Sequence, residues 1–202
     1  MKSVMLDNQD ISPTKILCIG RNYVEHIKEL GNEIPSSMVV FNKPNSSISH
    51  TLYDISDECH FEGEICFLML SNEIAGVGFG LDLTKRDLQS QLKSKGLPWE
   101  RAKSFDHSAV FSDFVSFGGD IKSLRLELYI NDKLVQSGGY DLMIYKPEQI
   151  VKELLTYTSF EDGDIIMSGT PKGVNRYKKG DLFVGKIYDG DEVLVEGCWI
   201  VV

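Results

Sequence analysis

The sequence predicts a β-rich α+β domain, and three observations support this fold class. Apolar runs and period-two alternation dominate the chain, and turn residues separate them. Helical spacing of apolar residues is confined to a few short stretches. The 202 residues are 42% hydrophobic and 25% charged, which is ordinary for a globular domain. We therefore expect one domain over residues 1–202, with 1–14 as an N-terminal extension or edge strand.

The first elements follow from short patterns. KILCIG, residues 15–20, is an apolar run that ends at a glycine and predicts a strand. RNYVEHIKELG then changes to helical spacing, which predicts a short helix with Tyr23, Ile27 and Leu30 on one stripe and Gly31 as its stop. The apolar run in MVVFNKP predicts the next strand.

The middle of the chain contains two further strands and a helix. FEGEICFLML, residues 61–70, and the glycine-punctuated AGVGFGLDL are interpreted as strands. TKRDLQSQLKSKGLPW predicts a helix with Thr84 as its N-cap, Asp87 in its first turn, and Gly96 and Pro98 as its terminators.

The last third of the chain returns to strands. LRLELYIND, KLVQSGG and DEVLVEGCWIVV alternate around turn residues, which is typical of antiparallel strands. PEQIVKELLTYTSF interrupts them with a second helix that has Pro147 near its start. The apolar residues of DII predict a strand that leads into MSGTPKGV.

The charge of the chain limits its partners. A net charge of -9 and a pI near 4.9, without a basic stripe, exclude a protein that wraps nucleic acid. An acidic protein that binds an anionic metabolite must neutralise it locally, and a divalent metal with one or two Lys or Arg does so. The N-terminus has no apolar h-region, and nowhere do 18 apolar residues follow one another. We expect a cytoplasmic protein with no membrane partner.

The four cysteines, Cys18, Cys59, Cys66 and Cys198, are scattered without a CxxC pair. This spacing fits neither a zinc site nor a disulfide framework. We expect all four to be small buried hydrophobic residues.

The stretch HFEGEI holds the first candidate site residues. Glu62 and Glu64 are two positions apart, so in a strand both carboxylates point to the same face. Two solvated carboxylates are the ordinary interpretation of such a pair. The apolar run that follows places them at the mouth of a buried strand, where an unpaired charge is unfavourable. With Asp82 at another strand end, they suit Mg²⁺ or Mn²⁺, whereas zinc normally adds His or Cys.

His26 and Glu29 are three positions apart on the first predicted helix and share a face. On spacing alone, an i,i+3 pair on the surface is the more common interpretation. The alternative is a dyad in which Glu29 orients the imidazole and His26 takes a proton from water.

Two further stretches have both an ordinary and a functional interpretation. SGTPKGV is a glycine-containing turn without the spacing of a phosphate loop, and Thr170 with neighbouring N–H groups could bind an oxyanion or a carboxylate. Lys103 in ERAKSFD is by default a surface lysine, and its functional interpretation is a cation that binds a substrate carboxylate.

Taken in order, several motifs make the chain resemble the fumarylacetoacetate hydrolase family. They are GRNYVEHIKELG, FNKP, FEGE, GFGLDLTKRDLQ, KGLPWERAKSFD and SGTPKGV, and they run from Gly20 to Val174. The resemblance is to its short single-domain branch of acylpyruvate hydrolases (acylpyruvases) and oxaloacetate decarboxylases. It implies a mixed β-roll with a few short helices, assembled as a homodimer.

The resemblance also implies a role for each matching residue. Glu62, Glu64 and Asp82 would hold Mg²⁺ or Mn²⁺. The residues with catalytic roles would be His26, Glu29 and Lys103. The residues that bind the substrate would be Arg21, Arg86, Gln89 and Thr170.

The implied reaction is hydrolysis of a carbon–carbon bond in an acylpyruvate, a 2,4-diketo acid such as acetylpyruvate or fumarylpyruvate. It releases pyruvate through an enolate that the metal stabilises. The same site suits the decarboxylation of oxaloacetate or a keto–enol tautomerisation, because both proceed through similar charge on a small anionic 2-oxo acid. A catalytically silent binding module is the third alternative, although every expected ligand position is filled.

Overall fold

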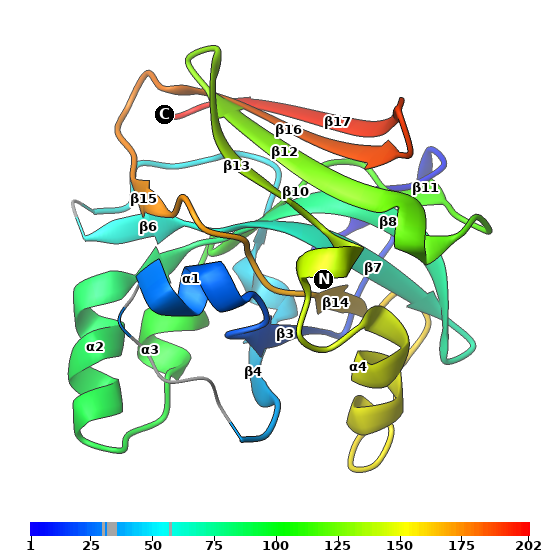
Figure 1. The fold of residues 1–202 in the computed structure, drawn as a ribbon, viewed down its shortest axis with the longest axis horizontal. Helices are drawn as coiled ribbons and strands as arrows, with labels where there is room; N and C mark the ends of the chain where they lie inside the picture. Colours follow the sequence, from blue (N-terminus) through cyan, green and yellow to red (C-terminus); the bar gives the residue numbers. More distant parts are fainter. Residues whose placement is uncertain (30, 32–35, 57) are drawn as a thin grey trace.

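The computed structural model describes residues 1–29, 31, 36–56 and 58–202. Two main sheets face one another, and the α-helices lie at one side of them (Figure 1). The predicted β-rich fold class is confirmed. None of the helices in the described part of the chain has the length and apolar character required to span a membrane.

The larger sheet is mixed and has eight strands in the order β4-β3-β14-β7-β8-β10-β5, with β11 paired to β8. Its strands are β3 (Lys15–Gly20), β4 (Val39–Pro44), β5 (Ile48–Ser49), β7 (Gly63–Leu70), β8 (Glu73–Asp82), β10 (Ala109–Phe111), β11 (Val115–Ser116) and β14 (Ile165–Met167). The interior strand β14 runs parallel to β3 and antiparallel to β7.

The second sheet is antiparallel, in the order β13-β12-β16-β17. Its strands are β12 (Leu124–Ile130), β13 (Lys133–Gly139), β16 (Leu182–Asp189) and β17 (Glu192–Ile200). Alternate residues such as Leu126, Leu128 and Phe183 are buried with Phe79 of β8 in one apolar core. This core between the two sheets is the main source of stability, because burial of apolar surface contributes about 25 cal/mol per Å².

Two small sheets complete the β structure. The hairpin of β1 (Val4–Leu6) and β2 (Gln9–Ile11) occupies most of the N-terminal stretch. The strands β6 (Cys59–Phe61), β9 (Thr84–Lys85) and β15 (Asn175–Arg176) form a three-stranded sheet. The strand predicted over 61–70 is therefore interrupted at Glu62, which lies between β6 and β7.

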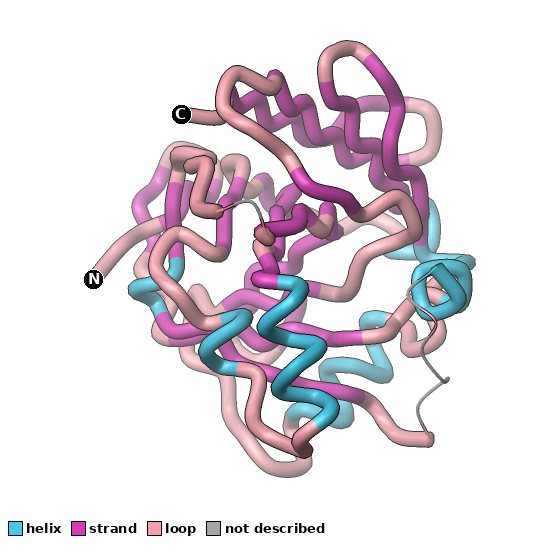
Figure 2. The backbone as a smooth tube through the Cα atoms, turned by 90° about the vertical axis from the view of Figure 1, so that its left-hand side faces the viewer, coloured by secondary structure: helices cyan, strands magenta, loops and turns pink. Residues whose placement is uncertain are grey.

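The α-helices are short: α1 (Val24–Glu29), α2 (Arg86–Ser94), α3 (Glu100–Lys103) and α4 (Pro147–Leu154). Seen from the side in Figure 2, they lie below the four-stranded sheet. Single-turn 3₁₀ segments are η1 (Asn45–Ser47), η2 (Ile121–Ser123) and η3 (Tyr140–Leu142). The prediction that Pro147 begins a helix is confirmed.

The predicted helix ends are confirmed in part. Gly31 follows α1 with φ +60°, and Gly96 follows α2 with φ +63°, as expected of glycines that stop a helix. Leu30, placed on the apolar stripe of the first helix, lies outside the described residues. The prediction that Thr84 is an N-cap is wrong: its backbone pairs with His60 in a strand, and α2 begins at Arg86.

Three cysteines are buried as expected, and Cys198 is exposed, which corrects the prediction for that residue. Cys198 lies on the outer face of β17, where its neighbours Gly197 and Trp199 occupy the buried face. The exposure of Cys198 therefore follows from the alternation of faces along β17, although its side chain is small and apolar.

Candidate metal and substrate site

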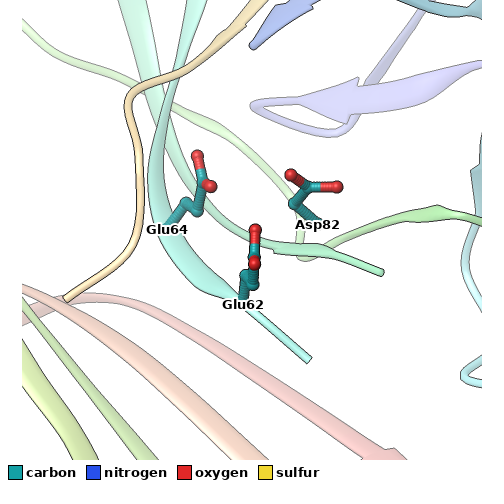
Figure 3. A group of neighbouring side chains, drawn as sticks. All are labelled: Glu62, Glu64 and Asp82. Carbon is teal, nitrogen blue, oxygen red and sulfur yellow. The ribbon is translucent and has the colours of Figure 1, made fainter. Parts of the chain in front are cut away.

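The three predicted carboxylates meet at the end of the β7–β8 hairpin. Glu64 is the second residue of β7, and Asp82 is the last residue of β8. The N–H of Asp82 donates to the carbonyl of Glu62 at 2.9 Å, which draws the third carboxylate to the same place. One oxygen of each residue lies within 4.8 Å of the others, and all three residues are buried (Figure 3).

Three cations surround these carboxylates. The ammonium of Lys103 donates to Glu62 Oε2 at 2.8 Å and to Asp82 Oδ2 at 2.6 Å. Lys43 lies 2.9 Å from Asp82 Oδ1, and Arg86 pairs with Glu62. Lys103 is 2% exposed, so the default interpretation of a surface lysine is wrong.

The electrostatics distinguish the two glutamates. Burial alone would raise the pKa of Glu62, but Lys103 and Arg86 outweigh it and hold that pKa well below its usual range. The pKa of Glu64 is well above its usual range, because burial is reinforced by the charges of Asp82 and Glu62. Among the described residues, the ion pairs of this cluster involve Glu62 and Asp82, and none involves Glu64.

The residues present fit a hard divalent ion. Asp82 Oδ1 is buried and its contact with the Lys43 ammonium, at 2.9 Å, lacks hydrogen-bond geometry, so within the described ranges this oxygen keeps an unused acceptor position. The donor set is three carboxylates, which suits Mg²⁺ or Mn²⁺ better than zinc. Glu62, Glu64 and Asp82 are the residues that would hold the ion.

Helix α1 presents the predicted dyad. His26 Nδ1 lies 3.3 Å from Glu29 Oε2, so the two side chains share a face as expected. His26 is 6% exposed, whereas Glu29 is exposed, so the pair joins a buried imidazole to a carboxylate at the surface. Burial lowers the pKa of His26, although the charges of Glu62 and Glu29 oppose that effect. The imidazole is therefore neutral at pH 7.

The SGTPKGV loop gives its N–H groups to carboxylates of the protein itself. Gly169 N–H donates to Glu64 Oε2 at 2.7 Å, and Gly173 N–H donates to both oxygens of Glu29 at 3.0 and 3.1 Å. One loop thus fixes a predicted metal ligand and the residue that orients His26. Thr170 donates its hydroxyl to the carbonyl of Gly63 at 2.8 Å and accepts from Gln136 at 2.9 Å.

A cleft opens over Glu62. Its described lining residues are Gly20, Arg21, His26, Phe41, Glu62, Arg86, Gln89, Lys93, Trp99 and Lys103. The structure therefore brings six of the predicted site residues to one opening. Glu29, Glu64, Asp82 and Thr170 are not among the described lining residues.

Several residues of this region were not predicted from the sequence. Phe41 and Lys43 lie in FNKP, Lys93 precedes KGLPW, and Trp99 is its last residue. The neighbours of Lys43 in the strand, Asn42 and Pro44, are exposed, so no local pattern marked this lysine as buried, and its partner Asp82 lies on another strand. Arg21 has φ +57°, so the turn after β3 holds a non-glycine residue in the left-handed region at the cleft.

Comparisons with known proteins agree with the motifs. The family model described as "Fumarylacetoacetate (FAA) hydrolase C-terminal" matches residues 15–198. Oxaloacetate tautomerase YcgM of Escherichia coli K12 is 33% identical over 191 residues, which cover 85% of this chain and 87% of that protein. The mitochondrial oxaloacetate tautomerase FAHD1 of Bos taurus is 35% identical over 184 residues, 82% of this chain and 83% of its own.

Solved structures have the same fold over nearly the whole chain. A structure from Oleispira antarctica, titled a putative fumarylacetoacetate isomerase/hydrolase, has a TM-score of 0.93 at 36% identity and covers 100% of both chains. Fumarylpyruvate hydrolase from Pseudomonas aeruginosa, in complex with Mn²⁺ and pyruvate, has a TM-score of 0.87 at 27% identity and covers 99% of this chain and 96% of its own.

Proposed function

We propose that this chain, which belongs to the fumarylacetoacetate hydrolase family, is a divalent-metal-dependent enzyme that interconverts the keto and enol forms of oxaloacetate. The observation that carries the proposal is the cleft, in which a neutral, buried His26 lies with two cations, Arg86 and Lys103, that pair with the carboxylate cluster. The names of the curated relatives support oxaloacetate as the substrate. The sequence alone favoured hydrolysis, with tautomerisation as an alternative, and the relatives reverse that preference.

The charge of the cleft favours a small dianion. Arg21, Arg86 and Lys103 line it, and Glu62 is its one acidic residue in the described lining. Arg86 also donates to Gln89 Oε1 at 2.8 Å, which fixes its guanidinium against the wall of the cleft. A guanidinium binds a carboxylate with two parallel N–H groups, so these arginines orient a 2-oxo acid as well as attract it.

Formation of the enol requires a base that removes a proton from C3, while the 2-oxo oxygen gains one. Formation of the keto form reverses both transfers. Glu29 accepts from Nδ1 of His26, which leaves Nε2 as the basic nitrogen of a neutral imidazole. A bound Mg²⁺ or Mn²⁺ would act as a Lewis acid that stabilises negative charge on the 2-oxo group. Mn²⁺ is named for one structural neighbour, and Mg²⁺ stays a prediction.

Hydrolysis of acylpyruvates is the second candidate, and the same dyad favours it. His26 could take the proton from a water molecule that attacks the distal carbonyl, and cleavage would leave a pyruvate enolate. The fumarylpyruvate hydrolase neighbour supports this reaction class. Oxaloacetate decarboxylation needs no water and stays open as a third outcome.

Parallel assays separate these reactions. The decay of enol-oxaloacetate absorbance and the release of pyruvate from acetylpyruvate and from oxaloacetate are measured with Mg²⁺, Mn²⁺ or EDTA. We expect enol decay that EDTA abolishes and that is lost in Glu62→Gln. The control Glu127→Gln should retain it, because Glu127 lies on the outer face of the four-stranded sheet, where it pairs with Arg125. Pyruvate release without accelerated enol decay would replace the tautomerase with a hydrolase or decarboxylase. Enol decay that EDTA and Glu62→Gln leave unchanged would contradict the metal site.

The homodimer and the cytoplasmic location stay predictions. Sedimentation of the purified protein would test the first, and cell fractionation would test the second.

A further inference from the structure

The ammonium of Lys103 lies between Glu62 and Asp82, two of the three residues that would hold a metal ion. It bridges the two carboxylates, at 2.8 Å from Glu62 Oε2 and 2.6 Å from Asp82 Oδ2. The other oxygen of Glu62 accepts from Arg86. Both oxygens of Glu62 are therefore already engaged, so a divalent ion that approaches them meets a resident cation.

The third partner of Lys103 is Thr84, a residue without an assigned role. Thr84 is fully buried, and its Oγ1 accepts from the Lys103 ammonium at 2.6 Å. An ammonium has three donors, and here the three acceptors are two carboxylate oxygens and one hydroxyl oxygen. We call these three oxygens, from Glu62, Asp82 and Thr84, the ammonium seat.

The two buried lysines of the region differ in their freedom. Lys43 is fully buried and is fixed by Ser108 Oγ at 2.9 Å and by the carbonyl of Lys103. Lys103 instead lines the cleft, with its ammonium 4.8 Å from the ring centroid of Phe41, another lining residue. The ammonium is therefore already in cation–π contact with this ring, and a shift toward the cleft can keep that contact.

We propose that Lys103, held in the ammonium seat by Thr84, is an internal competitor of the divalent ion. The inference rests on the metal site of the proposed function. Binding of the ion displaces the ammonium toward the cleft, because two cations in contact on the same carboxylates repel each other strongly in a buried site. The metal affinity is therefore lower than the carboxylates alone would provide, and loading the metal turns Lys103 toward the anionic substrate.

The affinity for Mn²⁺, measured by isothermal titration calorimetry on metal-free protein, tests this competition. Lys103→Met removes the charge and keeps an unbranched side chain one heavy atom shorter, and we expect it to bind Mn²⁺ about tenfold tighter or more. Thr84→Val keeps the shape and removes one acceptor, and we expect severalfold tighter binding. Lys15→Met is the matched control: Lys15 pairs with the buried Asp164 at another site, so its Kd should equal that of the unmutated protein.

The sign of the change separates competition from damage. A site distorted by substitution binds metal more weakly, whereas removal of a competitor strengthens binding. If Lys103→Met does not fold, the Mn²⁺ affinity of Thr84→Val decides whether Lys103 competes with the ion. A cooperative thermal unfolding transition shows that a variant is folded. An unchanged or weaker Mn²⁺ affinity in the folded variants would overturn the competitor and leave the proposed function intact. Absence of Mn²⁺ binding by the unmutated protein would overturn both.

Discussion

Gly169 and Glu64 are 105 positions apart in sequence, and the N–H of Gly169 donates to Glu64 Oε2 at 2.7 Å. This hydrogen bond orients a predicted metal ligand from the backbone of another element. Gly169 adopts φ +101°, and a Cβ built there would lie 2.7 Å from Cβ of Asn22. A side chain at this position would therefore move the N–H away from Glu64.

Gly169→Ala tests this link. We expect the free energy of unfolding to fall by about 1–3 kcal/mol, because the left-handed backbone and the contact with Asn22 both oppose a side chain. Mn²⁺ affinity should fall as well, which calorimetry measures. Gly96→Ala is the control, since Gly96 has φ +63° with no heavy atom within 4 Å of its Cβ position. Equal Mn²⁺ affinities in the two variants would contradict the role of Gly169.

The pH dependence of activity should follow His26. Its pKa lies below the ordinary value of 6.5, chiefly through burial, and a base works in its neutral form. We expect kcat/KM to be level above pH 6.5 and to fall with decreasing pH at a midpoint below that value. A bound divalent ion would shift the midpoint in the same direction, because its charge opposes protonation. A midpoint above 6.5 in stopped-flow rates would exclude His26 as the base.

Glu29→Gln should lower kcat and shift this midpoint. Glu29 raises the pKa of His26 through its hydrogen bond and its charge, so its neutral replacement moves the midpoint to lower pH. We expect kcat to fall about 10- to 100-fold, because the imidazole becomes a weaker and less oriented base. Glu25→Gln on the same helix is the control, because Glu25 is exposed and pairs with Lys28. A pH profile that Glu29→Gln leaves unchanged would remove the dyad from the mechanism.

Metal binding should release protons. The pKa of Glu64 is well above its usual range because of burial and the neighbouring carboxylates, and a carboxylate that binds metal must be ionised. Mn²⁺ affinity should therefore rise with pH until the pH exceeds the pKa of Glu64. Titration in buffers of different ionisation enthalpy measures the release, and we expect about one proton per site at low pH. The same enthalpy in every buffer would mean that Glu64 is already ionised.

Asp164→Asn should destabilise the fold and leave the reaction unchanged. Asp164 accepts from the N–H groups of Thr14 and Lys15 at 2.9 and 3.0 Å and pairs with the Lys15 ammonium. Burial would raise its pKa, but these hydrogen bonds outweigh it and lower the pKa below 3.8. Its contribution is therefore complete above pH 3.8 and is lost as pH falls through the folded-state pKa.

Urea unfolding at pH 7 should report a loss of about 2–4 kcal/mol in Asp164→Asn. The difference from the unmutated protein should shrink in acid, where the native carboxylate is protonated. A difference that is the same at both pH values would mean that the charge of Asp164 contributes nothing.

Local patterns predict much of this fold. Period-two alternation identified β12, β13 and β17, and helical spacing identified α1, α2 and α4. Strands of two or three residues such as β5, β9 and β11 were missed, because so short a stretch has no period of its own. Thr84 illustrates the limit: its sequence neighbours favour an N-cap, whereas pairing with His60 makes it a strand residue.

The residues of the candidate site also divide into those that local spacing predicts and those that only tertiary contacts bring together. Spacing within a motif is local, so Glu62 with Glu64 and His26 with Glu29 could be paired from the sequence. The partners of Lys103 lie 41 and 21 positions away, and no local pattern distinguishes a buried lysine from an exposed one. Lys43 was missed for the same reason. The family resemblance identified Lys103, and the tertiary contacts explain why it is buried.

The position of β14 in the larger sheet also determines when the site can form. Its two neighbours, β3 and β7, precede it by about 150 and 100 residues. The edge that each of them presents to β14 therefore stays unpaired until Ile165–Met167 have been synthesised. The loop that holds Glu64 and Glu29 follows directly. During translation the hydrogen bonds from this loop to Glu64 and Glu29 therefore form last, and a chain that stops before residue 165 would expose two strand edges to aggregation.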